Sequence, residues 1–200
     1  MKAVRGMAVA ILCMFALCGL ARADGAPTLV LDPLGGAISG AAGATVGWGF
    51  TLTNPGVDFL VVTSSDFCVG VITSPCSNSL GTYTDFAGPQ FIVAGPSPES
   101  SSVTQAFDNT LLTGMGSFLI NPGATGSVTG EIVLTYDLYS VDPNSPSFNP
   151  TVDTVAVGDS LLAGASVTVG AVTTPEPGSL LLLGTGLLGV LGAARRKLLV

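Results

Sequence analysis

A strict alternation of apolar and polar residues marks two stretches of this chain as long β-strands. They are residues 45–54, with apolar Val46, Trp48, Phe50 and Leu52, and residues 126–140, with apolar Val128, Ile132, Leu134, Tyr136 and Leu138. Because successive side chains of a strand point to opposite faces, each stretch has one apolar face for a core and one polar face for solvent. The turn Asn54-Pro55-Gly56 ends the first stretch, and we expect residues 58–65 to return as its hairpin partner.

Shorter runs of the same kind, divided by Gly, Pro and Asn, extend the β pattern along the chain. They are residues 28–32, 81–86, 90–94, 116–120 and 165–172. No stretch between residues 24 and 174 has a helical period with caps, so we expect at most a turn or two of helix. About seven to nine short strands of this kind predict an all-β domain, an antiparallel β-sandwich.

Two strand entries share the sequence Gly-Ala-Thr, at residues 43–45 and 123–125. They resemble the opening strands of immunoglobulin-like modules in bacterial surface proteins. The resemblance implies an immunoglobulin-like sandwich and no particular activity. The Pro- and Ser-rich stretches 94–102 and 141–153 are expected as solvated loops, which are places where function is often found.

Residues 1–23 have the three parts of a secretory signal peptide. A basic start is followed by an apolar stretch over residues 7–20 and by a small-x-small cleavage site formed with Ala21 and Ala23. We therefore expect export through the Sec translocon and cleavage after Ala23, which leaves Asp24 as the first mature residue.

Two alternatives for this segment fit less well. A retained N-terminal membrane helix would need about 20 apolar residues. A lipoprotein signal would need a small residue before Cys13 or Cys18, and leucine occupies both of those positions.

The charges of the chain are divided sharply between its ends and its middle. All six basic residues lie in the terminal segments; they are Lys2, Arg5, Arg22, Arg195, Arg196 and Lys197. Between Asp24 and Ala194 there is no Lys, Arg or His, and this span holds all thirteen acidic residues. Such a surface repels phosphate backbones and anionic lipids, so nucleic acid is excluded as a partner. The fold must depend on sheet hydrogen bonds and apolar packing.

The number and position of the cysteines are consistent with export. After removal of the signal peptide only Cys68 and Cys76 remain, and an isolated pair in an exported protein predicts one disulfide. A zinc site is the alternative, but the chain has no His and two thiolates make a poor ligand set. We expect neither a metal nor a cofactor.

The sequence offers few residues that could act in catalysis. Without His or Lys, the usual general bases and serine nucleophile systems are missing between residues 24 and 194. A two-carboxylate glycosidase is the remaining possibility, with candidates Asp137, Asp142, Asp153 and Asp159. Acidic residues in turns and on strand faces are more often simply solvated, so we expect a non-catalytic protein.

Two binding functions stay open as alternatives. A calcium site can be built from oxygen ligands in and beside the second loop, at Asp137, Asp142, Asn144 and Asp153, although no D-x-D-x-D-G pattern occurs. A carbohydrate-binding face needs exposed aromatic rings, for which the candidates are Tyr83, Phe86, Tyr139 and Phe148.

Residues 174–200 form a tail with three parts. Pro175, Glu176 and Pro177 are followed by an apolar run and then by the basic cluster Arg195, Arg196 and Lys197. The sixteen residues 179–194 predict a single short transmembrane helix. Its length is about 24 Å, which is less than the roughly 30 Å hydrocarbon core, so spanning needs a thinned bilayer. The basic cluster would keep the C-terminus in the cytoplasm.

This order resembles the PEP-CTERM sorting signal, a tail that some schemes label an ice-binding protein C-terminal domain. The resemblance implies that Pro175, Glu176 and Pro177 are recognised by an exosortase, a membrane-embedded cysteine transpeptidase or protease of Gram-negative bacteria. It implies an inner-membrane intermediate, then the cell surface or the extracellular matrix, with exopolysaccharide as a candidate partner. Residues 198–200 follow the basic cluster, where many such tails stop sooner.

The chain therefore divides into a signal peptide (1–23), an exported β domain (24–173) and a sorting tail (174–200). The sequence predicts a non-catalytic protein that is sorted to the surface or matrix. A β domain held permanently in the membrane by its C-terminal helix is the alternative. The threonines are scattered along the sequence, so the ice-binding label carries no expectation of antifreeze activity.

Overall fold

The computed structural model describes residues 25–70, 72, 76–97 and 101–170. The predicted signal peptide, the transmembrane helix 179–194 and the sorting tail lie outside these residues. The elements in chain order are β1 (Thr28–Asp32), β2 (Ala37–Gly40), β3 (Thr45–Thr53), β4 (Phe59–Cys68), β5 (Gly81–Asp85), β6 (Val93–Ala94), β7 (Ser102–Gln105), β8 (Gly116–Ile120), β9 (Ser127–Tyr139), α2 (Pro150–Asp153) and β10 (Thr154–Val169). The all-β prediction is confirmed, with two sheets enclosing one core.

The first sheet is organised around β3. Its strand order is β1-β3-β8-β5, and β7 pairs with the second half of β3, beyond the part that pairs with β8. The polar face predicted for β3 lies outward, where hydroxyl pairs join neighbouring strands: Thr51 with Thr104 and Thr53 with Ser102, each with oxygens 2.9 Å apart.

The second sheet has the order β2-β10-β9-β4-β6, and it contains one parallel pair. β2 runs parallel to β10, so the prediction of a wholly antiparallel sandwich is wrong at this edge. The cause is a change of sheet between β1 and β2: Gly36, at φ 66°, accepts hydrogen bonds on its carbonyl from the Trp48 indole (2.7 Å) and from the Ser166 amide (2.9 Å). A Cβ at Gly36 would meet the Gly164 carbonyl oxygen at 2.3 Å, so only glycine fits the crossing.

The core lies between the two sheets. Trp48 on β3 packs against Phe67 on β4, with ring centroids 5.3 Å apart, and Phe118 on β8 closes the cluster edge-on to Phe67 at 5.7 Å. The apolar positions that the alternation placed inward, such as Phe50 and Ile132, are fully buried. The two predicted long strands are therefore confirmed with their faces.

The predicted hairpin between residues 45–54 and 58–65 is wrong. β4 belongs to the second sheet, where it pairs with β9 and β6. The side chain of Asn54 explains the crossing, because its amide donates to the carbonyls of Ala94 (3.0 Å) and Gly95 (3.2 Å), at the end of β6. These bonds tie the turn to the opposite sheet.

Other boundaries also differ from the prediction. β2 and β7 are strands that the sequence did not indicate, and β6 has only two residues where 90–94 was predicted. β10 begins at Thr154, eleven residues before the predicted start at 165, and two register shifts near Ala156 disturb its alternation. No helix among the described residues has the length and apolar character needed to cross a membrane.

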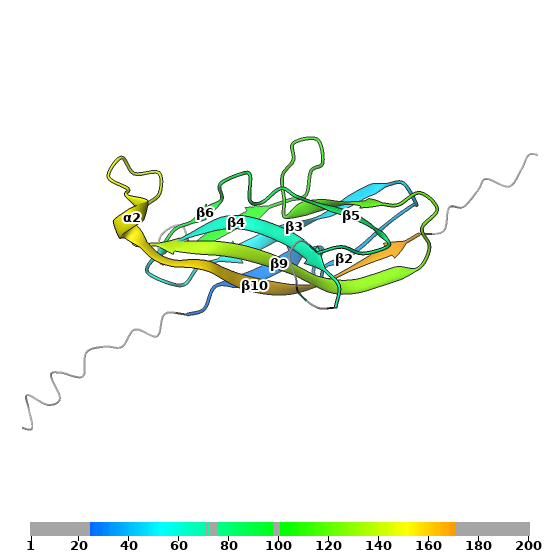
Figure 1. Cartoon of the computed structure of the whole chain (residues 1–200), viewed down its shortest axis with the longest axis horizontal. Coiled ribbons are helices and arrows are strands. Elements are labelled where there is room, and N and C mark those ends of the chain that lie inside the picture. The colour runs from blue at the N-terminus through cyan, green and yellow to red at the C-terminus, as the bar shows by residue number, and fades with distance from the viewer. Residues whose placement is uncertain (1–24, 71, 73–75, 98–100, 171–200) are drawn as a thin grey trace, which may run out of the picture.

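The described domain is elongated (Figure 1). β1, drawn in blue, begins toward the end where α2 lies, and β10 finishes at the opposite end. The two described ends of the chain, next to the predicted signal peptide and sorting tail, therefore leave the domain far apart.

Candidate functional site

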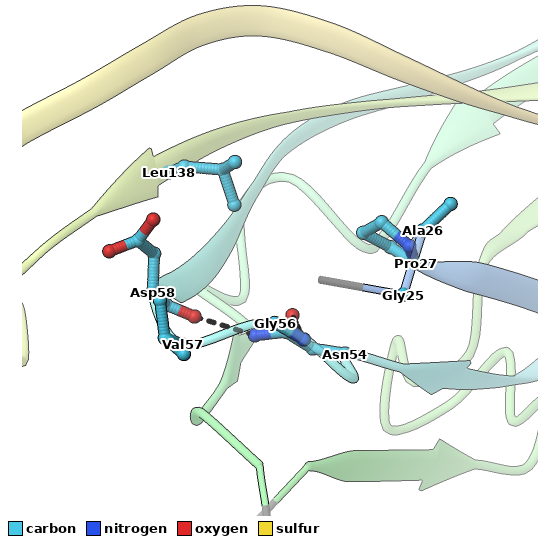
Figure 2. Close-up of a pocket in the computed structure, with 8 residues that line it drawn as sticks. All are labelled: Gly25, Ala26, Pro27, Asn54, Gly56, Val57, Asp58 and Leu138. Atoms are coloured by element: carbon cyan, nitrogen blue, oxygen red, sulfur yellow. Dashed lines mark hydrogen bonds between the residues drawn. The ribbon is translucent and has the colours of Figure 1, made fainter. Parts of the chain in front are cut away.

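A cavity of about 220 Å³ opens between the start of β1 and the turn that follows β3 (Figure 2). Its walls come from three places: the segment that precedes β1, the turn between β3 and β4, and the end of β9. The lining residues are Gly25, Ala26, Pro27, Asn54, Gly56, Val57, Asp58 and Leu138. The cavity therefore lies where the two sheets diverge, beside the first described residue of the chain.

Asn54 forms the rigid floor of this cavity. Its side-chain amide donates to the carbonyls of Asp58 (2.7 Å), Ala94 and Gly95, and its side-chain oxygen accepts from the Gly56 amide (3.1 Å). Asn54 is only 1% exposed. Because both of its polar atoms are occupied inside the protein, Asn54 is available to position the turn and not to bind a ligand.

Asp58 supplies the only ionisable side chain among the lining residues. Its backbone carbonyl accepts from Asn54, whereas no hydrogen bond to its carboxylate occurs within the described residues. In Figure 2 the carboxylate extends away from the turn on the side of Leu138. The cavity thus has an apolar wall, a fixed floor and one negative charge at its rim.

A second cavity, of about 200 Å³, lies between β1 and β10. It is lined by Leu29, Val30, Leu31, Gly35, Gly36, Ala163 and Gly164. None of these side chains is polar, so the second cavity offers no side-chain group for catalysis or for binding an ion.

The structure places the predicted calcium ligands in separate local hydrogen bonds. Asp137 accepts from the Gly158 amide (2.9 Å), Asp142 from the Asn144 amide (2.9 Å) and Asp153 from the Asn149 amide (2.7 Å). Within the described part of the chain, the one group of three acidic or sulfur side chains close enough to share an ion is Asp66, Cys68 and Cys76. The carboxylates of Asp137, Asp142 and Asp153 do not form such a group. Of the glycosidase candidates, Asp159 on β10 is paired with Tyr136, which precedes Asp137 on β9.

Cys68 and Cys76 form the predicted disulfide, with Cα atoms 4.9 Å apart. Asp66 supports the closed loop, because its carboxylate accepts from the backbone amides of Phe67 (2.8 Å) and Cys76 (2.7 Å). With both sulfur atoms bonded to each other, neither is a thiolate ligand, and the role of this group is to hold the loop on the end of β4.

Of the four aromatic residues proposed for carbohydrate binding, Phe86 is buried and Tyr83 is partly buried. The Tyr83 hydroxyl bonds to Ser65 (2.7 Å) and to the Met115 carbonyl (3.1 Å). Burial raises the pKa of Tyr83 far above its ordinary value. The Phe86 ring is therefore not available for stacking on a sugar, and the hydroxyl of Tyr83 is already hydrogen-bonded within the protein.

The other two aromatic residues lie together at the end of the domain near α2. The rings of Tyr139 and Phe148 meet edge-to-face with centroids 5.1 Å apart, and both side chains are partly exposed. The Tyr139 hydroxyl donates to Asp137 (3.2 Å), and partial burial, with the Asp137 charge as a second cause, raises the pKa of Tyr139.

An exposed apolar pair was not indicated by the sequence. Phe91 and Leu112 are 53% and 54% exposed, and they are the two non-glycine residues with positive φ in the described chain, at 52° and 54°. The Gln90 side chain donates to the Leu112 carbonyl and joins the two loops. Positive φ at bulky residues is strained and often accompanies binding sites, but no alternation or motif signals it in advance.

Comparison with known families matches residues 173–197 to the PEP-CTERM protein-sorting motif. No match was found among curated proteins. The matched residues contain Pro175, Glu176 and Pro177 and the basic cluster, so the resemblance on which the tail was interpreted is confirmed. The chain carries a PEP-CTERM protein-sorting motif, which marks it as an exported, membrane- or cell-surface-associated protein that an exosortase sorts.

Proposed function

We propose that this protein is a non-catalytic component of the cell surface or extracellular polysaccharide matrix of a Gram-negative bacterium. The matched sorting motif at residues 173–197 carries this proposal. In it, the Sec translocon exports the chain, cleavage after Ala23 removes the signal peptide, and the tail holds the protein in the inner membrane until the exosortase acts. The β domain is then the part that works outside.

The described domain has features suited to this destination. Its ten acidic side chains have no Lys, Arg or His among the described residues to pair with, so it repels other anionic surfaces and stays soluble. The core and the Cys68–Cys76 disulfide stabilise it without salt bridges. Its two ends leave on opposite sides, so the domain can extend away from a tail held in the membrane (Figure 1).

We also infer an immunoglobulin-like fold for the domain. The strand orders β1-β3-β8-β5 and β10-β9-β4 support it, because they correspond to the A-B-E-D and G-F-C orders of that sandwich. The extra strand β6 beside β4 has a counterpart in the variable-type form. The chain departs from antibody domains in its disulfide, which joins Cys68 to a nearby loop and not the two sheets to each other.

Carbohydrate binding is the second candidate function. It is favoured by the partly exposed Tyr139–Phe148 pair with Asp137 beside it, since an aromatic face next to a carboxylate suits a sugar ring and its hydroxyls. Calcium binding has less support, because each carboxylate that it would need accepts a hydrogen bond from a different backbone amide.

The sorting proposal is tested by changing the motif alone. Replacement of Pro175, Glu176 and Pro177 by alanine in the full chain should leave the protein in the inner-membrane fraction, whereas Leu198→Ala, beyond the matched residues, should be delivered like the wild type. Fractionation of the host envelope and medium measures this. Normal delivery of the triple variant would contradict the proposal.

A further inference from the structure

The first described residue of the domain is seated directly on the turn that closes the cavity. A Cβ at Gly25 would meet the Pro55 ring, at 2.9 Å from Cγ and 3.0 Å from Cβ. Gly25 therefore packs directly against the Pro55 ring, with no space between them for a side chain. Gly25 itself lines the cavity (Figure 2), and consecutive Cα atoms of a chain are about 3.8 Å apart.

Cleavage after Ala23 would place a positive charge at that position, next to the negative side-chain carboxylate of Asp24 itself. Asp24 would begin the mature chain, and its α-amino group, with an ordinary pKa of about 7.7–8.0, is an ammonium ion at neutral pH. From Asp24 to Ala194 the sequence has no Lys, Arg or His, so this ammonium is the only cation of the exported domain. The one charged group lining the cavity is the Asp58 carboxylate, which has no hydrogen-bond partner in the described chain.

We propose that the cavity is the binding site of the mature N-terminus, with the Asp24 ammonium paired to the Asp58 carboxylate. This inference depends on the proposed cleavage after Ala23. A tether of one residue gives the ammonium an effective concentration that a free small cation cannot match. Before cleavage the same position is an uncharged peptide bond, so removal of the signal peptide completes the end of the sandwich and stabilises the exported form over the precursor.

The pairing has a defined pH dependence. The carboxylate favours the charged amine and raises its pKa in the folded state. The stabilisation is therefore fully present below the pKa of the unfolded amine, about 7.7–8.0, and is lost as the pH rises through the higher folded value.

Chemical labelling of amines tests the proposal directly, because the mature domain has no lysine. The exported protein is purified from its host, its N-terminus is read by mass spectrometry, and the rate of acylation of the α-amine is followed at pH 8. If a tail with Lys197 is retained, peptide mapping separates the two amines. The rate in the wild type should be roughly three- to tenfold lower than in Asp58→Asn, since only the neutral amine reacts. Asp159→Asn, which removes an exposed carboxylate of β10, should label like the wild type.

Asp58→Glu keeps the charge and should restore slow labelling, which separates pairing from a general effect of substitution on folding. Equal rates in the wild type and Asp58→Asn would overturn the inference and leave the cavity to a ligand from outside or to a second copy. An N-terminus other than Asp24 would also overturn it, together with the proposed cleavage site. Sorting by the tail would stand in either case, because the motif variants report on it separately.

Discussion

At the scale of single residues, a few side chains direct this fold against the local pattern. The alternation around Trp48 and Phe50 was sufficient to predict which face of β3 is buried, because it depends only on the period of a strand. The role of Asn54 was not predictable, since a turn with Asn-Pro-Gly is usually solvated. Its importance comes from Ala94 and Gly95, forty residues away, whose carbonyls reach it only in the folded protein.

Asn54→Ala should destabilise the domain by about 2–4 kcal/mol. The substitution removes the amide that donates to the buried carbonyls of Ala94 and Gly95 and to the partly buried carbonyl of Asp58, and the loss of such donors is costly. Asn121→Ala is the matched control, because Asn121 is exposed and its amide makes one bond, to the Ser79 carbonyl (3.0 Å), so that its loss should cost below about 1 kcal/mol. Denaturant unfolding measures the free energy of unfolding of both variants. An equal loss of stability in the two variants would contradict the role assigned to Asn54.

At the scale of elements, the long regular strands were predicted and the irregular or short ones were not. β3 and β9 have clean alternation, whereas the first half of β10 is interrupted by Gly158, which has φ 73° and donates to Asp137. The hairpin error at β4 has the same origin, because local sequence indicates a strand but not the sheet it joins. Of the candidate sites within the described domain, the disulfide was the one that could be predicted in full, since it needs two cysteines at a short separation and no knowledge of the fold.

Replacement of Cys68 and Cys76 by alanine should lower the free energy of unfolding by about 2–3 kcal/mol. The bond closes a loop with a sequence separation of 8 and restricts the unfolded chain. Asp66 still accepts from two amides in the loop, so the domain should remain folded. Reduction of the wild type should reproduce the loss, and a double variant as stable as the oxidised wild type would show that the loop needs no covalent closure.

At the scale of the whole molecule, charge is the dominant property that the sequence fixes in advance. Ten carboxylates and no Lys, Arg or His occur in the described domain, so every long-range interaction among its charged side chains is repulsive. The destination of the protein, in contrast, depends on the tail at 173–197 and not on the domain.

The stability of the exported domain at pH 7 should rise by on the order of 1 kcal/mol when NaCl is raised from about 10 to 200 mM, because salt screens this repulsion. Thermal unfolding across a salt series measures the change. The stability of a variant with Asp159→Asn and Glu131→Gln should depend less on the salt concentration. Stability that falls with added salt would mean that attractive pairs, which the described residues do not contain, control the fold.

The intact mass of the protein from its host, with and without the exosortase, tests whether the tail is a processed sorting signal. We expect a chain that begins at Asp24 and that, only in the strain with the enzyme, lacks the residues after the Pro175-Glu176-Pro177 region. The same full-length tail in both strains would contradict this expectation, because the matched motif would then be a membrane anchor and not a processed sorting signal.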